Sequence, residues 1–292
     1  NYGYNKNLIT GKVFEKNFKT KIDSEKNKIN FKLLKSGLTT NISFDPTPKI
    51  NTISGVLQSK ILNAKIKFNF DYNGKILKIY NSYFRSKNLS FKNYTIMTLN
   101  PFLDVETKFN VEKFDFHILK KNNLYDLLKS KEVIKKLNSR NEINFKAEKL
   151  SKNLIDELNI KFDLAYGRVN YLKKISISEN NFICSGNINL LEEFPILYFD
   201  CSIYSKNKKK LLKHFLIKIK HNEEVFILST KGNLNVLNNK INFKKIVLND
   251  NYNASKEDLK YFKEAFENII LVEGVLEMFN IKKIKKFILE IS

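Results

Sequence analysis

The sequence predicts a mainly β fold, an antiparallel sheet with a few helices that lie mostly toward the C-terminus. Three observations support this fold class. Apolar and polar residues alternate with a period of two along most of the 292 residues, as they do in strands that bury one face. The turns between these segments are too short for the crossover connections of parallel strands. Helical spacing is confined to four short segments, three of them after residue 205.

The composition allows a folded core and limits the classes of function. With 42% hydrophobic and 13% aromatic residues, the chain is long enough for one large domain or two ordinary ones. Its net charge of +22 comes from 49 lysines and only three arginines, beside 40 asparagines. We attribute much of this charge to A/T-rich base composition and solvated faces. The sequence contains no run of about 18 apolar residues, so it predicts no membrane-spanning helix. Two cysteines and three histidines are too few for a disulfide framework or a tetrahedral metal site.

Glycines mark a recurrent local pattern. Seven of the nine are followed two residues later by Val, Ile or Leu. Glycine accepts the positive φ of a tight turn or bulge, and an apolar residue soon afterwards suits a strand that restarts with its core-facing side chain in place. We therefore expect turns or bulges at Gly11, Gly55, Gly74, Gly167, Gly186, Gly232 and Gly274.

The clearest strands have one apolar and one polar face. Ala64, Ile66, Phe68 and Phe70 alternate with lysine, asparagine and aspartate, and Asn73-Gly74 then predicts a two-residue hairpin turn. A second apolar face, ending at Tyr166-Gly167, consists of Leu158, Ile160, Phe162 and Leu164. Further apolar faces are expected at Phe182, Cys184, Ile188 and Leu190, at Leu197, Phe199, Cys201 and Ile203, at Phe215, Ile217 and Ile219, at Leu234 and Val236, and at Ile241 and Phe243. Weaker segments at 14–22, 29–33, 38–44, 94–99, 103–111 and 143–147 bring the expected number to about 14 strands.

Four helices are expected beside these strands. Asn123 caps the first, residues 206–213 form a short second, and Ser255 with Asp258 forms a capping box at the start of the third. The fourth is the basic, amphipathic tail from Phe279 to Ile291. No Pro-, Gly- or Ser-rich linker divides the chain, so residues 1–292 are expected to form one continuous unit. Its expected parts are an upstream meander (1–121), a helical interruption (122–139), a β region (140–250) and a helical C-terminal cap (251–292).

The apolar face of so many strands needs a cover. Open sheets of more than about ten strands usually curl, split or close, and four short helices cannot cover about 14 strands. Three arrangements solve this problem: two sheets packed as a sandwich, a closed barrel, or a long curled trough lined by a ligand.

Part of the chain resembles a known family. The segments that carry the resemblance are 141–150 (NEINFKAEKL), 158–169 (LNIKFDLAYGRV), 175–178 (ISIS) and 186–190 (GNINL), followed by a helix-then-strand stretch at 206–220, a strand pair at 232–248 and the helix after Ser255. In this order they are similar to the C-terminal region of AsmA-like proteins, and the upstream strands are similar in general style. The family has no catalytic signature to carry over.

This resemblance implies an elongated, curled β-groove with a hydrophobic lining. AsmA, TamB and YhdP, which have such grooves, are anchored in the inner membrane of Gram-negative bacteria, extend through the periplasm and are thought to carry phospholipid to the outer membrane. For this chain the resemblance implies a periplasmic fragment with an inner-membrane anchor upstream. The fragment would shelter phospholipid acyl chains in outer-membrane biogenesis. The implied partners are phospholipid or another acyl lipid and the membranes at the ends of the full-length protein. No cofactor is expected. The expected groove lining is Ala64, Ile66, Phe68, Phe70, Leu158, Ile160, Phe162, Leu164, Leu197, Phe199, Ile217 and Ile219.

Cys184 and Cys201 lie on the apolar faces of adjacent predicted strands. We expect opposed residues of this hairpin to have numbers that sum to about 387. That register makes the cysteines a diagonal pair, and we expect two buried thiols rather than a disulfide.

Other signals give no catalytic or metal site. His214 and His221 flank one predicted strand without a third ligand nearby, and solvated histidines are expected there. No nucleophile, general base and orienting group can be placed together, and no glycine-rich phosphate loop is present, so no enzymatic activity is expected.

Two other functions compete with lipid handling. A structural or adhesive β-solenoid or sandwich predicts a closed core and, for a solenoid, a more uniform repeat. Nucleic-acid binding would use the basic cluster at 208–210, but arginine, the preferred reader of bases, is nearly absent, and no nucleic-acid partner is expected. The tail at 279–291 has the pattern of a helix on an anionic membrane surface, but packing against a sheet end is the favoured reading.

Overall fold

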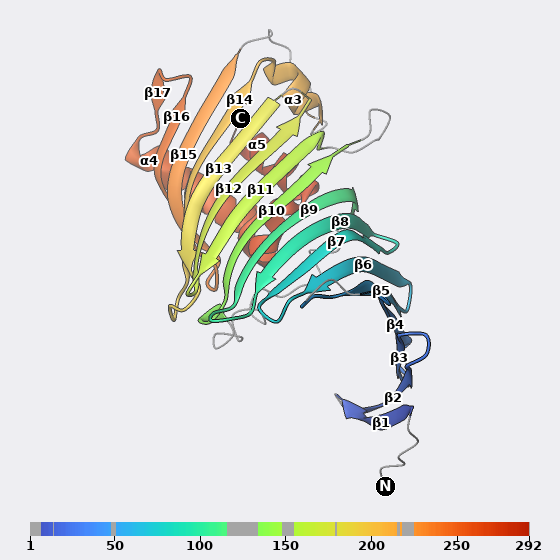
Figure 1. Ribbon diagram of the computed structural model, residues 1–292. Coiled ribbons are helices and arrows are strands. Elements are labelled where there is room, and N and C mark those ends of the chain that lie inside the picture. Colours follow the sequence, from blue (N-terminus) through green and yellow to red (C-terminus); the bar gives the residue numbers. More distant parts are fainter. Residues whose placement is uncertain are drawn as a thin grey trace. The chain divides into compact units, whose positions relative to one another are not determined.

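The computed structural model describes residues 7–13, 15–47, 51–115, 134–147, 155–178, 180–214, 217 and 225–291 (Figure 1). The chain forms two compact units, Asn1–Asp115 and Phe116–Ser292. Within each unit, every described strand runs antiparallel to the strand that follows it. The predicted mainly β, antiparallel fold with helices near the C-terminus is therefore confirmed.

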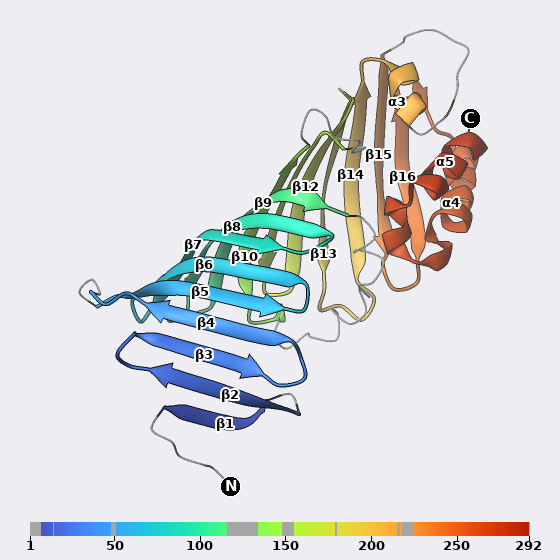
Figure 2. The same ribbon diagram turned by 90° about the vertical axis from the view of Figure 1, so that its right-hand side faces the viewer.

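The first unit contains a meander of nine strands. They are β1 (Leu8–Val13), β2 (Lys16–Asp23), β3 (Lys28–Leu33), β4 (Leu38–Phe44), β5 (Ile53–Ile61), β6 (Ala64–Tyr72), β7 (Ile76–Arg85), β8 (Leu89–Thr98) and β9 (Asp104–Phe114). Figure 2 shows them side by side in sequence order. Among the described residues of this unit β1 and β9 do not pair, so this sheet neither closes as a barrel nor packs on a second sheet of its own unit.

The hairpin between β6 and β7 forms where the sequence predicts it. The side-chain oxygen of Asn73 accepts hydrogen bonds from the backbone amides of residues 75–76, at 3.1 and 2.8 Å. Gly74 has φ +87°, a left-handed conformation that glycine adopts without strain. The turn fixes the register in which Phe70 lies opposite Ile79, and this register decides which face of each strand is apolar.

The second unit contains eight strands followed by helices. The strands are β10 (Asn138–Lys146), β11 (Glu157–Ala165), β12 (Arg168–Ile177), β13 (Asn180–Asn189), β14 (Ile196–Ser205), β15 (Phe226–Asn235), β16 (Lys240–Leu248) and β17 (Tyr252–Asn253). The helices are α3 (Lys208–His214), α4 (Lys256–Ile269) and α5 (Ile281–Glu290), with 3₁₀ turns η2 (Leu271–Glu273) and η3 (Val275–Phe279). Figures 1 and 2 show α4 and α5 on one side of this sheet.

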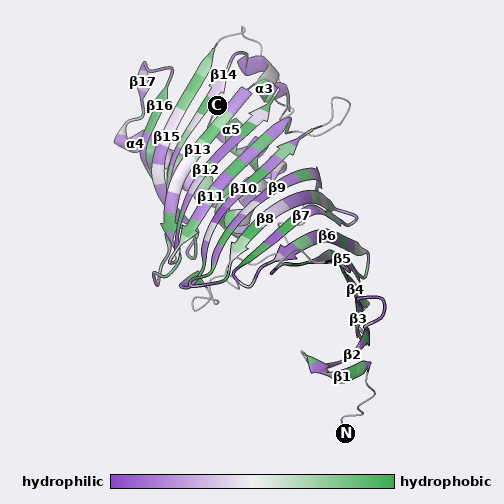
Figure 3. Ribbon diagram, viewed as in Figure 1, coloured by the Kyte–Doolittle hydropathy of each residue, from purple (hydrophilic) through white to green (hydrophobic). Residues whose placement is uncertain are grey.

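In each unit the strands present an apolar face and a polar face, because the register aligns the alternating residues of neighbouring strands. In the first unit, Phe44, Gly55, Phe70 and Ile79 follow one another across four strands. In the second unit a row of aliphatic residues crosses six strands: Leu164, Val169, Ile188, Leu197, Leu234 and Ile241. Figure 3 shows the resulting alternation of hydrophobic and hydrophilic residues along the strands.

The buried core lies in the second unit, where the C-terminal helices cover part of the apolar face. Leu234 and Ile241 from the sheet are buried together with residues 269–271, which end α4 and begin η2. Phe243 of β16 lies between Phe199 of β14 and Phe266 of α4, with ring centroids 6.1 and 5.8 Å apart. The aromatic contacts therefore connect the sheet to the helix directly.

Helix α4 begins with the predicted capping box. Ser255 Oγ accepts a hydrogen bond from the Asp258 amide at 3.1 Å, and Asp258 Oδ2 accepts one from the Ser255 amide at 2.9 Å. Near the other end, Glu267 accepts from the Ile241 amide at 3.0 Å and pairs with Lys240 Nζ at 2.9 Å. The two contacts of Glu267 attach the helix to β16.

The basic tail forms α5 and packs within the second unit. Its Phe287 ring contacts Phe266 of α4, with centroids 5.2 Å apart and planes at 85°. Ile284 and Phe287 both pack against the buried cluster, and the Tyr261 hydroxyl donates to the Glu290 carbonyl at 2.9 Å. The apolar stripe of the tail therefore covers the core, as the packing alternative predicts.

Some predicted elements differ from the structure or lie outside it. Most of the helix predicted at 122–139 falls outside the described residues, and β10 already begins at Asn138. Strands β1 and β17 were not expected, which explains part of the difference between 17 strands and about 14. The short helix predicted at 206–213 is present as α3.

Candidate functional site

The first candidate surface is the apolar face of the first unit. The predicted residues Ala64, Ile66, Phe68 and Phe70 all lie on one face of β6, and all four are half-buried. Their register partners on β5 include Leu57 opposite Phe68. The ring of Phe70 also meets Phe44 of β4 edge-on, with centroids 6.0 Å apart, so the apolar surface is continuous from strand to strand.

This face has no fully buried hydrophobic side chain in the part of the first unit that the structure describes. The fully buried hydrophobic residues of the described chain all fall between Ile134 and Leu271, in the second unit. Ile9 and Ile53, on the apolar face of β1 and β5, remain 51% and 52% exposed. The side chains of the face shield one another along the sheet, but they do not form a closed core.

A polar cluster interrupts the apolar face of the first unit. It consists of Ser82, Asn93, Thr95 and Thr107, on β7, β8 and β9. The Thr95 and Thr107 hydroxyl oxygens are 2.8 Å apart. The side-chain amide of Asn93 donates to Thr95 Oγ1 at 2.9 Å, and its backbone N–H donates to Ser82 Oγ at 2.7 Å. Because these groups satisfy one another, the cluster can be buried within an apolar surface. The register of β7 shifts between Ile79 and Phe84, so the period-two pattern of the sequence does not predict this cluster.

The second candidate surface is the apolar face of the second unit. Leu158, Ile160, Phe162 and Leu164 of β11 all lie on it and are half-buried, as do Leu197 and Phe199 of β14. Leu197 and Leu164 belong to the aliphatic row described above. Leu197 packs against the buried cluster that includes residues 269–271, and Leu164 packs against Ile134 and Leu190. Two further rows cross the same face. The first is Ile143, Ile160, Lys173, Cys184, Cys201, Thr230 and Ile246, and the second is Phe145, Leu158, Ile175, Phe182, Ile203, Leu228 and Leu248.

The predicted strand around Ile217 and Ile219 cannot be placed with these rows. Ile219 lies outside the described residues. Ile217 is half-buried but is not in a strand, and its amide donates to the Leu212 carbonyl at 3.0 Å, just after α3.

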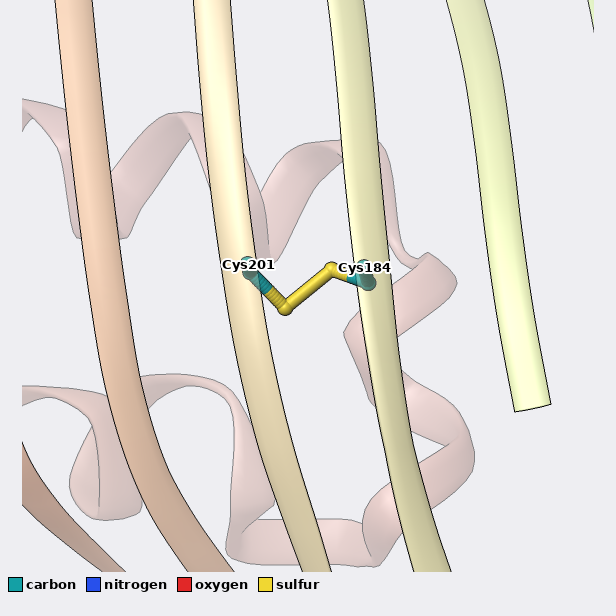
Figure 4. Close-up of a disulfide and its surroundings, with 2 residues drawn as sticks. All are labelled: Cys184 and Cys201. Carbon is teal, nitrogen blue, oxygen red and sulfur yellow. A yellow bond between two sulfur atoms is a disulfide. The ribbon is translucent and has the colours of Figure 1, made fainter. Parts of the chain in front are cut away.

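The expectation of two free thiols is wrong. Cys184 and Cys201 form a disulfide between β13 and β14 (Figure 4). They lie directly opposite each other, because Ile188 pairs with Leu197 and the register runs unshifted to the cysteines. The numbers of opposed residues in this hairpin sum to 385 and not to the expected 387, which turns the expected diagonal pair into a direct one.

The expectation of a turn or bulge at each of seven glycines is correct for some of them. Gly74 and Gly167 lie in hairpin turns with positive φ. Gly232 lies where the register between β15 and β16 shifts, and Gly274 has φ +117° between η2 and η3. Gly11, Gly55 and Gly186 instead lie inside strands without a register shift, and these three and Gly232 each lie opposite an aromatic residue of a neighbouring strand. At Gly186 an added Cβ would lie 2.9 Å from the Tyr171 ring, and at Gly232 it would lie 2.7 Å from Phe199. These in-strand glycines make room for aromatic rings on the apolar face.

Lys173 is the residue of this face that sequence analysis missed. It lies on β12 opposite Ile160 on one side and Cys184 on the other. Burial lowers the pKa of its ammonium group, because removal from water disfavours the charged form. The turn at Tyr166-Gly167 could have revealed this position, since the same turn sets the register of the whole hairpin.

Metal and membrane-spanning features are reported only for the described residues. Within them, no three His, Cys, Asp or Glu side chains are grouped to hold a metal ion. No described helix is both long and apolar enough to cross a membrane.

In comparisons with known proteins, no family model, no curated protein and no solved structure matches the chain.

Proposed function

We propose that this chain acts without chemistry and shelters the acyl chains of phospholipids on the apolar faces of its sheet. The observation that carries the proposal is the sheet of the first unit. It presents nine strands with one apolar and one polar face, and its described residues include no fully buried hydrophobic side chain. A sheet face of this kind is what an apolar ligand needs as a lining.

The physical basis is the transfer of hydrocarbon out of water. Each CH₂ group of an acyl chain gains about 0.8 kcal/mol when it is buried against apolar surface. Half-buried side chains such as Ile66 and Phe68 also gain free energy when an acyl chain covers them, because their remaining apolar surface then leaves water. Ordinary monomers seldom leave large contiguous apolar patches exposed. Neither gain needs a specific side chain, so a period-two pattern is sufficient to encode the surface.

The second unit supports the same function with part of its face already covered. Helices α4 and α5 pack over the row that contains Leu197 and Leu234. The rows of Ile160 and Leu158 continue the apolar face, and their residues are half-buried except Ile246, which is buried. We place the lipid-contacting surface of this unit on those two rows and assign the helices to capping the remainder.

The proposed setting is the periplasm, in a longer protein anchored in the inner membrane that moves lipid toward the outer membrane. Two arguments support it. The sequence of residues 141–270 resembles the C-terminal region of AsmA-like proteins, and this resemblance implies an envelope protein. The Cys184–Cys201 disulfide is of the kind that persists in oxidising compartments.

Mass spectrometry of the purified chain tests the proposal. We expect co-purifying phospholipid, and transfer of labelled phospholipid from donor vesicles to the protein. Phe68→Asp should reduce the transferred lipid several-fold by placing a charge on the apolar face, whereas Asn69→Asp adds the same charge on the polar face and should leave transfer unchanged. Absence of bound lipid together with absence of transfer would refute the proposal.

A further inference from the structure

Lys173 is the one charged residue on the apolar face of the second unit within the described strands β10–β16. The polar face of the same strands carries many charges, including Lys161, Lys174 and Lys231, at positions shifted by one residue. In a chain with 28% charged residues, nearly every charge of this unit's sheet points away from the apolar face, and Lys173 does not.

Among the described residues, no counter-charge pairs with Lys173. Its register neighbours are Ile160 on β11 and Cys184 on β13, and the residues two positions away on its own strand are Tyr171 and Ile175. Within the part of the chain that the structure describes, its amine makes no ion pair or hydrogen bond. A half-buried ammonium without a partner is costly, and burial lowers its pKa accordingly.

Tyr171 adds a second polar group two residues earlier on the same face of β12. Its ring lies over Gly186, where an added Cβ would be 2.9 Å from the hydroxyl oxygen. Burial raises the pKa of this phenol, so it stays protonated and able to donate. As with Lys173, no hydrogen bond is recorded for the hydroxyl within the described residues. Two donors, one of them cationic, therefore share one side of one strand.

We propose that Lys173, with Tyr171, binds the phosphate of an anionic glycerophospholipid whose acyl chains lie on the adjacent apolar rows. This inference rests on the proposed function and adds to it a preference for a headgroup charge. The phosphate supplies the missing counter-charge and accepts from both donors. The row of Leu158, Ile175 and Phe182 lies two residues further along each strand and offers the acyl chains an apolar path.

The geometry favours a lipid over an acidic peptide as the occupant. Strand β12 is paired on both sides, with β11 and β13, so its backbone groups are used in the sheet. A peptide lying across this face would bury its own amides and carbonyls without partners. An acyl chain has no such groups to satisfy.

A competition for lipids tests the assignment. The whole chain is incubated with vesicles that contain equal amounts of dioleoyl phosphatidic acid, dioleoylglycerol and oleate, and the lipid retained by the re-isolated protein is quantified. We expect about tenfold enrichment of phosphatidic acid over dioleoylglycerol, the size of a charge-assisted contact. Lys173→Met should abolish this enrichment while total bound lipid stays the same, and Lys173→Arg should keep it.

Lys174→Met is the matched control, because it removes the same charge from the adjacent, exposed position. It should keep the enrichment, which separates a local contact from general attraction of a +22 protein to acidic vesicles. Equal retention of the phosphatidic acid and dioleoylglycerol by the unaltered chain, or unchanged enrichment in Lys173→Met, overturns the assignment alone. Preferential retention of oleate overturns the choice of phosphate. Retention of no lipid overturns the proposed function as well.

Discussion

Cys184 of β13 and Cys201 of β14 face each other directly on the apolar side of the sheet, with Cα atoms 4.1 Å apart, and are joined by a disulfide. A direct pair on one face of an antiparallel ladder brings side chains this close when its two residues do not exchange backbone hydrogen bonds. The bond thus follows from the register that the connection between β13 and β14 sets.

The disulfide predicts the thiol content and the stability of the second unit. The unreduced chain, unfolded in denaturant, should contain no titratable thiol, because both of its cysteines are paired. Replacing both with alanine should lower the free energy of unfolding by up to about 3 kcal/mol, since the bond closes a short loop in the unfolded chain. Two thiols per unreduced chain would contradict the pairing.

Gly186 should not tolerate a larger residue. A Cβ at this position would collide with the Tyr198 carbonyl and with the Tyr171 ring. Gly186→Ala is expected to lower the free energy of unfolding by about 1–3 kcal/mol, as overpacking does. Gly74→Asn is the control, since a Cβ at Gly74 meets no atom within 4 Å and asparagine accepts a positive φ. Equal effects in urea titrations would argue against the close packing at Gly186.

The two units should respond differently to loss of apolar side chains. Leu234 is 2% exposed in the core beneath the helices, and Leu234→Ala should cost about 2–5 kcal/mol of unfolding free energy. Ile66 is only half-buried, and Ile66→Ala should cost about 1 kcal/mol in the lipid-free chain. Denaturant titrations of both variants measure the difference. A large cost at Ile66 would indicate a closed core in the first unit.

The capping box of α4 should make its stability depend on acid. Hydrogen bonds from Tyr252 and from the Ser255 amide and hydroxyl hold the pKa of Asp258 below its ordinary value of 3.8. The ionised carboxylate therefore stabilises the folded state above that value, and the contribution is lost as the pH falls through the lowered pKa. Asp258→Asn should weaken the acid dependence of helix content measured by circular dichroism. Ser255→Ala should cost about 1 kcal/mol at neutral pH.

Local signals in the sequence were sufficient for the elements that depend on a few neighbouring residues. The alternation from Ala64 to Tyr72 gives β6, because a strand with one apolar face has a period of two. The Ser255–Asp258 box gives the start of α4, because both of its hydrogen bonds lie within four residues. Within β6, and separately within β11, the predicted lining residues share one face of their own strand because of the same period.

Features that depend on register or distant packing could not be read in the same way. The disulfide depends on the length of the connection before Ile196, where an error of two residues changes a direct pair into a diagonal one. Lys173 is followed by Lys174, so the sequence alone does not show which of the two lies on the apolar face. The alignment of β12 with β11 identifies Lys173. In-strand glycines such as Gly186 and turn glycines such as Gly167 also share one local pattern, and only the aromatic residue opposite distinguishes them.

The central claim, that acyl chains lie on the apolar face of the sheet, is tested most directly by photo-crosslinking at adjacent positions. A benzophenone amino acid is placed at Phe68, on the apolar face of β6, or at Asn69, on the polar face, and the protein is irradiated with labelled phospholipid vesicles. The account predicts lipid adducts at position 68 and a several-fold lower yield at position 69. Equal yields at both positions, or adducts at neither, would contradict it.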